Sequence, residues 1–137
     1  MEAVFLDTSF ILALEDADDQ KHETATRFWM GFKQKPGKII TTTYVFDETV
    51  TFLRRRITHD KAAHVGKLLL SSPSVELIHI SEVQFDKSWK LFLKYHDKGF
   101  SFTDCVSFIV MEERGTKEAM TFDEHFRQKG YCIANPL

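Results

Sequence analysis

The sequence predicts an α/β fold in which four or five parallel strands lie between two layers of helices. Short apolar runs alternate along the chain with longer segments whose apolar residues recur every three or four positions. This strand–helix alternation is typical of a parallel sheet that is covered on both faces. The chain has 137 residues, 43% of them hydrophobic, which is enough for the core of one domain spanning residues 1–137.

The expected strands are short and mostly apolar. Ala3–Leu6 is an unbroken apolar run with β-branched and aromatic members, which predicts a strand buried on both faces. Val75–Ile80 alternates apolar with polar residues, which predicts a strand nearer the edge of the sheet. The other strands are expected at Lys38–Thr42, Glu118–Thr121 and Gly130–Ile133.

The expected helices fill the segments between these strands. Thr103–Glu113 is apolar almost all round, so it is predicted to be deeply buried. A further helix is predicted from about Ser81 to His96. Its three aromatic residues and one leucine at helical spacing are expected to face inward: Phe85, Trp89, Phe92 and Leu93. The remaining helices are predicted at Ser9–Leu14, His22–Lys35, Tyr44–Thr58 and His59–Leu70, with a brief turn or helix ending at Phe126.

Four acidic residues occupy places where a parallel sheet would bring them together. Asp7 ends the first strand, Asp123 follows the fourth, and Asp104 lies in the first turn of the buried helix. Glu48 lies at the rim of the apolar face of its helix. Carboxylates that converge repel one another and stay ionised only beside a cation, and oxygen ligands of this kind select Mg²⁺ or Mn²⁺.

Each of these acids also has a purely structural interpretation. Asp7 and Asp123 could cap the helices that follow them, and the segment from Ser101 to Asp104 matches a capping box. Glu48 could pair with an arginine. Of the six histidines only His125 falls near these acids, and we interpret it as a structural or solvated group.

Charge and cysteine content restrict the class of protein. A net charge of −2 argues against a nucleic-acid coat protein held by charge alone, but allows an enzyme that meets phosphates through a metal ion. Arg54, Arg55 and Arg56 either match the dipole at a helix end or contact RNA. Cys105 and Cys132 lack zinc-site spacing, and we expect reduced core thiols in a soluble, cytoplasmic protein without a membrane span.

Four segments of the chain resemble the signature segments of PIN-domain ribonucleases: Leu6–Ser9, Phe46–Thr49, Ser101–Cys105 and Thr121–Phe126. The resemblance extends over essentially the whole chain, with the segments in the right order and spacing, and is strongest to the VapC-like toxins of toxin–antitoxin modules. It implies a parallel sheet with helices on both sides and an endoribonuclease that depends on Mg²⁺ or Mn²⁺.

By this resemblance Asp7, Glu48, Asp104 and Asp123 correspond to the metal-binding, catalytic quartet, and Thr8 or Thr121 to an accessory hydroxyl. Members of this family usually dimerise and are often held inactive by a partner, so a homodimer and an antitoxin protein are expected beside the RNA substrate. The alternative is a non-catalytic module of the same fold that binds metal and RNA without cleavage.

Overall fold

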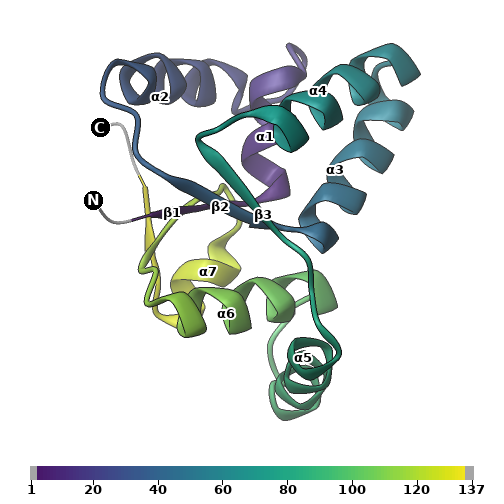
Figure 1. The fold of residues 1–137 in the computed structure, drawn as a ribbon, viewed down its shortest axis with the longest axis vertical. Helices are drawn as coiled ribbons and strands as arrows, with labels where there is room; N and C mark the ends of the chain where they lie inside the picture. Colours follow the sequence, from purple (N-terminus) through teal and green to yellow (C-terminus); the bar gives the residue numbers. More distant parts are fainter. Residues whose placement is uncertain (1–2, 135–137) are drawn as a thin grey trace.

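The computed structural model describes residues 3–134, in which a five-stranded sheet lies between two layers of helices (Figure 1). All strand pairs are parallel and the strand order is β3-β2-β1-β4-β5, so the predicted α/β/α fold is confirmed. The strands are β1 (Val4–Leu6), β2 (Ile39–Thr42), β3 (Val75–Ile78), β4 (Glu118–Met120) and β5 (Cys132–Ile133).

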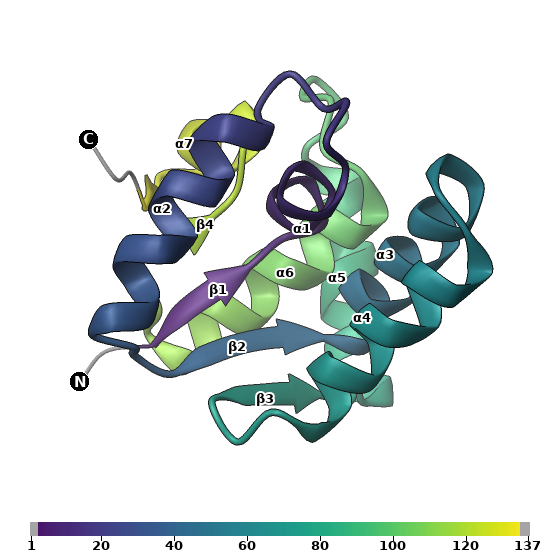
Figure 2. The same ribbon diagram turned by 90° about the horizontal axis from the view of Figure 1, so that it is seen from above.

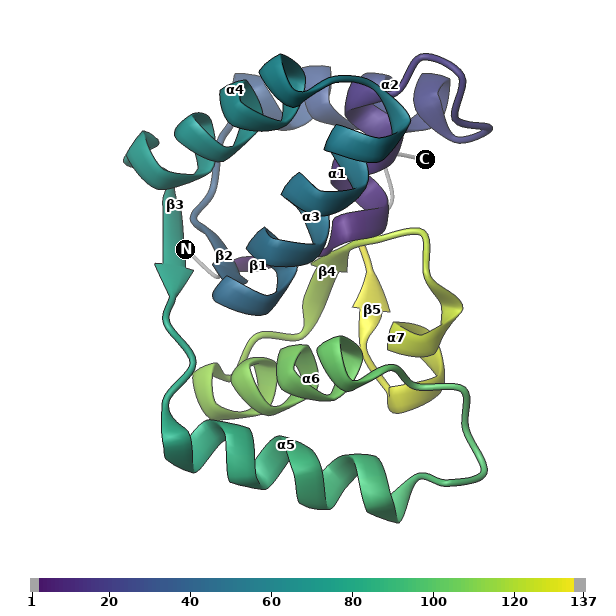
Figure 3. The same cartoon turned by 90° about the vertical axis from the view of Figure 1, so that its right-hand side faces the viewer.

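Helices cover both faces of the sheet (Figure 3). One side carries α1 (Thr8–Glu15), α2 (His22–Gln34), α3 (Thr43–Arg56) and α4 (His59–Ser71). The other side carries α6 (Phe102–Arg114) and α7 (Glu124–Lys129), with α5 (Glu82–Lys94) packed along α6. Within residues 3–134 no helix combines the length and the hydrophobicity that crossing a lipid bilayer requires.

The order in which successive strands are added to the sheet reverses at β1, and this reversal creates the point where a site can form. From β1 the chain proceeds through β2 to β3 on one side, whereas β4 and β5 lie on the other. Figure 2 shows the arrowheads of β1, β2 and β3 pointing the same way, toward α1 and α3. Ligands of open α/β sheets bind outside the carboxyl ends of the strands at such a switch point, which here lies between β1 and β4.

The core lies on both faces of the central strands. All three residues of the apolar strand β1 are buried, and so are all four of β2, where the hydroxyls of Thr41 and Thr42 are satisfied by hydrogen bonds with the backbone. The ring of Phe5 contacts that of Phe126 from α7, which in turn packs edge-on against Phe108 of α6. The edge strand β3 is only half-buried apart from Ile78, as its alternating sequence predicts.

The inward face predicted for α5 is wrong. Phe85, Trp89 and Phe92 are 44%, 49% and 37% exposed, and Leu93 is exposed as well. The face that packs on α6 instead contains Ser88, which is fully buried and bonds through Oγ to the carbonyl of Gln84 at 2.7 Å. A small residue such as Ser88 lets two helices approach closely, and its hydroxyl is satisfied by a carbonyl of its own helix. The aromatic side chains project from a neighbouring face of α5, so they remain exposed.

The two cysteines also differ from expectation. Both are free, and Cys105 on α6 is buried as predicted. The interpretation of Cys132 as a core thiol is wrong, because it is exposed on the two-residue edge strand β5. A strand of two residues at the edge of the sheet has a neighbouring strand on one side only, so the side chain of Cys132 is left open to solvent.

The orientation of α5 can be tested by filling the place of its small buried residue. We expect Ser88→Leu to lower the free energy of unfolding by about 1–3 kcal/mol, because the added atoms overpack the contact with α6. The exposed Lys90 on the same helix is the control, and Lys90→Leu is expected to change stability by less than about 0.5 kcal/mol. Urea denaturation measures both; a Ser88→Leu variant as stable as wild type would contradict the packing described.

Candidate active site

Asp7 lies at the end of β1 with its carboxylate turned toward β4. It occupies the N-cap position of α1, but its side chain makes no capping hydrogen bond. Its Oδ2 instead accepts hydrogen bonds from Ser9 Oγ at 2.8 Å and from Thr121 Oγ1 at 2.7 Å. The side chain is 4% exposed. Helix capping therefore does not explain why an acid stands here.

Ser9 and Thr121 form a hydrogen-bond network that joins the chain after β1 to the chain after β4. Their hydroxyl oxygens lie 3.0 Å apart. Ser9 Oγ also accepts from the backbone N–H of Phe122 at 2.9 Å, and Thr121 Oγ1 accepts from that of Asp123 at 3.0 Å. Of the two hydroxyls predicted as accessory, those of Thr8 and Thr121, it is Thr121 that bonds to Asp7. Ser9 bonds to Asp7 as well, and the sequence analysis did not predict this contact.

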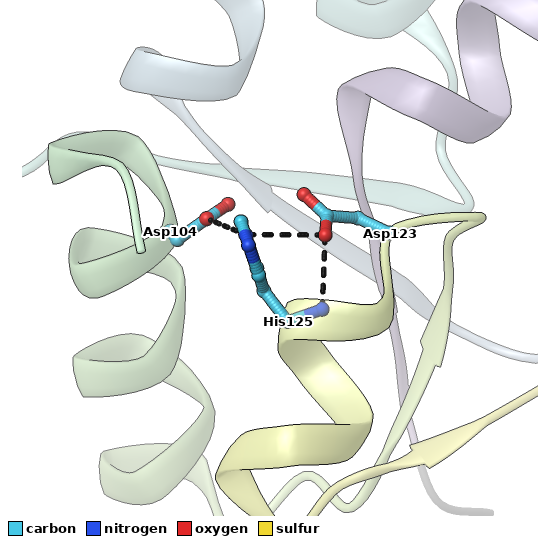
Figure 4. A group of neighbouring side chains, drawn as sticks. All are labelled: Asp104, Asp123 and His125. Atoms are coloured by element: carbon cyan, nitrogen blue, oxygen red, sulfur yellow. Dashed lines mark hydrogen bonds and ion pairs between the residues drawn. The ribbon is translucent and has the colours of Figure 1, made fainter. Parts of the chain in front are cut away.

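Asp104 and Asp123 each cap a helix and also face one another (Figure 4). Asp104 closes a capping box: its backbone N–H donates to Ser101 Oγ, and its Oδ2 accepts from the N–H of Ser101, both at 3.0 Å. Asp123 Oδ1 accepts from the N–H of His125 at 2.9 Å at the start of α7. Capping thus holds both carboxylates in fixed positions at the same end of the sheet.

The imidazole of His125 lies between these two aspartates. Its Nδ1 is 2.8 Å from Asp104 Oδ2 and 3.2 Å from Asp123 Oδ1. One potential ligand atom from each of the three residues lies within 4.8 Å of the others. The sequence interpretation of His125 as a structural or solvated group did not include this contact, for which the only signal was its place two residues after Asp123.

Glu48 approaches from α3, where it is half-buried as its place at the rim of the apolar face predicts. Burial raises the pKa of Glu48, a hydrogen bond with Thr8 opposes the rise, and the charges of Asp104 and Asp123 add to it. Thr8 is itself buried and also accepts a long 3.5 Å hydrogen bond from Thr49 Oγ1. Among the described residues, Asp7 and Glu48 lie outside the tight group around His125, but their charges are felt there.

Burial, and to a smaller extent repulsion between charges, makes Asp7, Glu48 and Asp104 hard to ionise. The pKa of Asp7 is raised from 3.8 to about 6, mainly by burial and to a smaller extent by the charges of Asp104 and Asp123, while the hydrogen bonds of Thr121 and Ser9 oppose the rise. The pKa of Asp104 is also raised by burial, although bonds from Ser101 and His125 oppose the rise. The site as folded is therefore short of positive charge.

The donor set fits a hard divalent cation. Asp7 and Asp104 each use Oδ2 for the bonds described above, and Asp123 uses Oδ1. Within residues 3–134, the second carboxylate oxygen of each accepts no hydrogen bond from the protein, so it can bind a ligand without breaking the support of its partner oxygen. Carboxylate oxygens in this number are typical of Mg²⁺ and Mn²⁺ sites.

The three arginines at the end of α3 differ in their surroundings. All are exposed. Arg56 Nη1 lies 3.5 Å from Asp19 Oδ2 and 3.9 Å from Asp16 Oδ2, so part of its charge is already balanced. Arg56 is eight residues beyond Glu48, roughly 12 Å along the helix axis. The arginines therefore lie beside the carboxylate cluster and not within it.

Comparison with known proteins places this geometry in a family. The family model described as "PIN domain" matches residues 4–130. The chain belongs to the PIN domain family. A relative from Mycobacterium tuberculosis, described as "23S rRNA-specific endonuclease VapC20", is 34% identical over 133 residues, which is 97% of this chain and 98% of the relative.

Two solved structures have the same fold as this chain. The crystal structure of Mycobacterium tuberculosis VapC20, described as a sarcin–ricin loop cleaving toxin, has a TM-score of 0.89 at 32% identity and covers 97% of this chain and 99% of that one. A toxin–antitoxin complex from Klebsiella pneumoniae has a TM-score of 0.66 at 12% identity and covers 98% of both chains. The second likeness concerns the fold alone.

The raised pKa of Asp7 predicts how stability depends on pH when metal is absent. Between its ordinary value of 3.8 and about 6, Asp7 holds more protons in the folded than in the unfolded chain. Stability that is complete below pH 4 is therefore lost as the pH rises through 6, by up to about 3 kcal/mol. Asp7→Asn removes this loss, because the amide is neutral and its oxygen can accept the bonds of Ser9 and Thr121.

We therefore expect Asp7→Asn to be more stable than wild type at pH 7 in EDTA, and the two proteins to converge near pH 4. Urea denaturation between pH 4 and 8 gives both curves. Saturating Mg²⁺ or Mn²⁺ should raise the stability of wild type more than that of the variant, because the ion binds only the folded chain. Parallel pH curves would refute a strained Asp7 carboxylate.

Proposed function

We propose that this protein is a metal-dependent endoribonuclease of the VapC toxin type. One observation carries the proposal: Asp104, Asp123 and His125 bring potential ligand atoms within 4.8 Å of one another at one edge of the sheet. Burial, and to a smaller extent neighbouring carboxylates, raises the pKa values of Asp7, Glu48 and Asp104 at the same edge. A fold that keeps such an arrangement gains from it when a cation binds. Membership of the PIN domain family and the endonuclease name of the relative support the same activity.

The proposed roles follow from the contacts of each residue. Asp7, Glu48, Asp104 and Asp123 hold Mg²⁺ or Mn²⁺ through their carboxylate oxygens. A bound divalent ion activates water and neutralises charge on the phosphate during in-line displacement. Thr121 and Ser9 keep Asp7 oriented, and Thr8 does the same for Glu48. Overall, water adds across one P–O ester bond of the RNA backbone.

The proposed substrate is RNA, and 23S ribosomal RNA is the first to test. The supporting observation is the name of the relative, which covers nearly the full length of both chains at 34% identity. The overall charge of −2 gives little attraction for phosphates, so binding depends on local groups. We assign that role to Arg54 and Arg55, with a smaller contribution from Arg56 because Asp16 and Asp19 balance it. A ribosomal substrate also implies that the protein acts in the cytoplasm.

The variant Asp104→Asn separates cleavage from binding and folding. The amide oxygen can still accept the capping bond from Ser101, but one ligand charge is lost. We expect cleavage of RNA to fall by about 100-fold or more, the scale on which removal of one electrostatic group affects a reaction centre. RNA affinity should stay equal or rise, since a negative charge facing the phosphates is gone. Gel assays of cleavage and filter binding measure the two quantities.

The exposed Asp60 provides the matched control, because it also lies in the first turn of a helix. Asp60→Asn should cleave like wild type, and EDTA should abolish cleavage by both. If neither wild type nor Asp104→Asn shows EDTA-sensitive cleavage, the protein is the non-catalytic module and the proposal fails. Equal cleavage by wild type and Asp104→Asn would also refute it, since the activity would then lie elsewhere or in a contaminant.

We further propose that the protein forms a homodimer through an aromatic patch beside the site and that an antitoxin protein controls it. The patch consists of Tyr44, Phe85, Trp89, Phe92 and Phe102, whose rings contact one another. Three of its members are exposed, and aromatic side chains that gather at a surface are typical of the centres of protein–protein interfaces. The antitoxin is inferred from the description of the VapC20 structure as that of a toxin.

Sedimentation equilibrium at micromolar concentration tests the dimer. We expect wild type to sediment as a dimer and Trp89→Glu as a monomer, because the charge would be buried against the second copy. Met30 on α2 is 62% exposed and serves as control, so Met30→Glu should remain dimeric. A wild-type monomer would overturn the dimer, and dissociation by Met30→Glu alone would move the interface to α2.

A further inference from the structure

We propose that His125 is itself a metal ligand, through Nδ1, and that it gives the site a preference for Mn²⁺ over Mg²⁺. The inference rests on the proposed function for the presence of a cation between Asp104 and Asp123. It goes further in adding a nitrogen donor to the carboxylates and in drawing a consequence for the choice of ion.

The distances around the imidazole match those between neighbouring ligands of one ion. Nδ1 lies 2.8 Å from Asp104 Oδ2 and 3.2 Å from Asp123 Oδ1 (Figure 4). In an octahedral ion with bonds of about 2.1 Å, ligand atoms at right angles stand about 3 Å apart. The ring nitrogen therefore already stands at the separation of a neighbouring ligand from an oxygen of each carboxylate.

The ring is held in this orientation by its far edge. A methyl group at Gly99 would lie 3.2 Å from Nε2, so the ring lies directly against the backbone there. Phe100 packs edge-on against the imidazole, with ring centroids 5.4 Å apart. The side chain remains 29% exposed. With Nε2 turned to Gly99, Nδ1 is the nitrogen that faces the carboxylates, and the site does not have to reorganise to use it.

Nitrogen as a ligand changes which ion the site prefers. Mg²⁺ favours oxygen ligands and binds imidazole poorly, whereas imidazole suits first-row transition ions such as Mn²⁺. Coordination through Nδ1 requires the neutral tautomer with its proton on Nε2. The competing role for His125 is that of a positioning residue, which donates a hydrogen bond to Asp104 and never touches the ion. The two roles predict different spectra and different selectivity.

Pulsed electron paramagnetic resonance of the Mn²⁺-loaded protein detects a coordinated nitrogen directly. We expect the echo to carry the modulation of a bound ¹⁴N nucleus, and protein labelled with ¹⁵N only in histidine to show the ¹⁵N pattern instead. Labelling needs no substitution, so the result does not depend on the folding of a variant. Modulation that does not respond to the label would overturn the inference.

The variant His125→Gln tests selectivity, because its amide can still hydrogen-bond to Asp104 but is a poor ligand. Isothermal titration calorimetry should show Mn²⁺ affinity reduced by at least about 10-fold, the lower limit for loss of a partner around a metal, and Mg²⁺ affinity changed much less. The exposed His64 is the control, so His64→Gln should bind both ions like wild type. If His125→Gln keeps the wild-type ratio of the two affinities, His125 is a positioning residue only.

Failure of this inference can be told apart from failure of the proposed function. If wild type binds Mn²⁺ and cleaves RNA but its echo shows no modulation from histidine nitrogen, the nuclease proposal holds and His125 is not a ligand. If the echo shows histidine modulation but no cleavage is sensitive to EDTA, His125 is a ligand and the proposal of a metal-dependent nuclease is wrong. Absence of any Mn²⁺ binding at millimolar concentration would overturn both.

Discussion

The buried carboxylate of Asp7 is the constraint on which the rest of the site depends. Asp7 lies where the strand order reverses, between β1 and β4, so the chain segments that follow these two strands meet around it. The hydroxyls of Ser9 and Thr121 make its burial tolerable and at the same time tie the two chain segments together. Because they do not cancel the effect of burial, the folded chain keeps a deficit of positive charge that a bound cation would relieve.

The sequence determined the elements of the fold more securely than their exposure. Every expected strand and helix is present, since the alternation of short apolar runs with helical periodicity allows little except a parallel α/β sheet. The orientation of α5 failed because periodicity shows that a stripe exists but not which side is covered. There the small buried Ser88 decided the packing, and the larger Trp89 was left outside.

The candidate site could be foreseen where it follows from topology. Asp7 and Asp123 come at the ends of parallel strands, and parallel strands end on the same side of a sheet. For Asp104 and Asp123 the sequence offers helix capping and clustering as alternatives, whereas in the structure each carboxylate does both. Ser9 and His125 could not be assigned from the sequence, because the contacts that join them to the rest of the site, with Thr121 and Asp104, are made to residues far away along the chain.

The double use of Asp104 and Asp123 limits how this protein can change over evolutionary time. A substitution that removes the charge also removes a hydrogen bond at the start of a helix, unless the new residue can accept that bond from the backbone. At the N-cap position of Asp123 asparagine, serine and threonine can do so, and at Asp104, the third residue of its helix, asparagine can, whereas alanine or an aliphatic residue can do so at neither position. Descendants that gave up catalysis but kept the fold would therefore carry small polar residues at these two positions. Their sequences would preserve the outline of the former site long after its chemistry had gone.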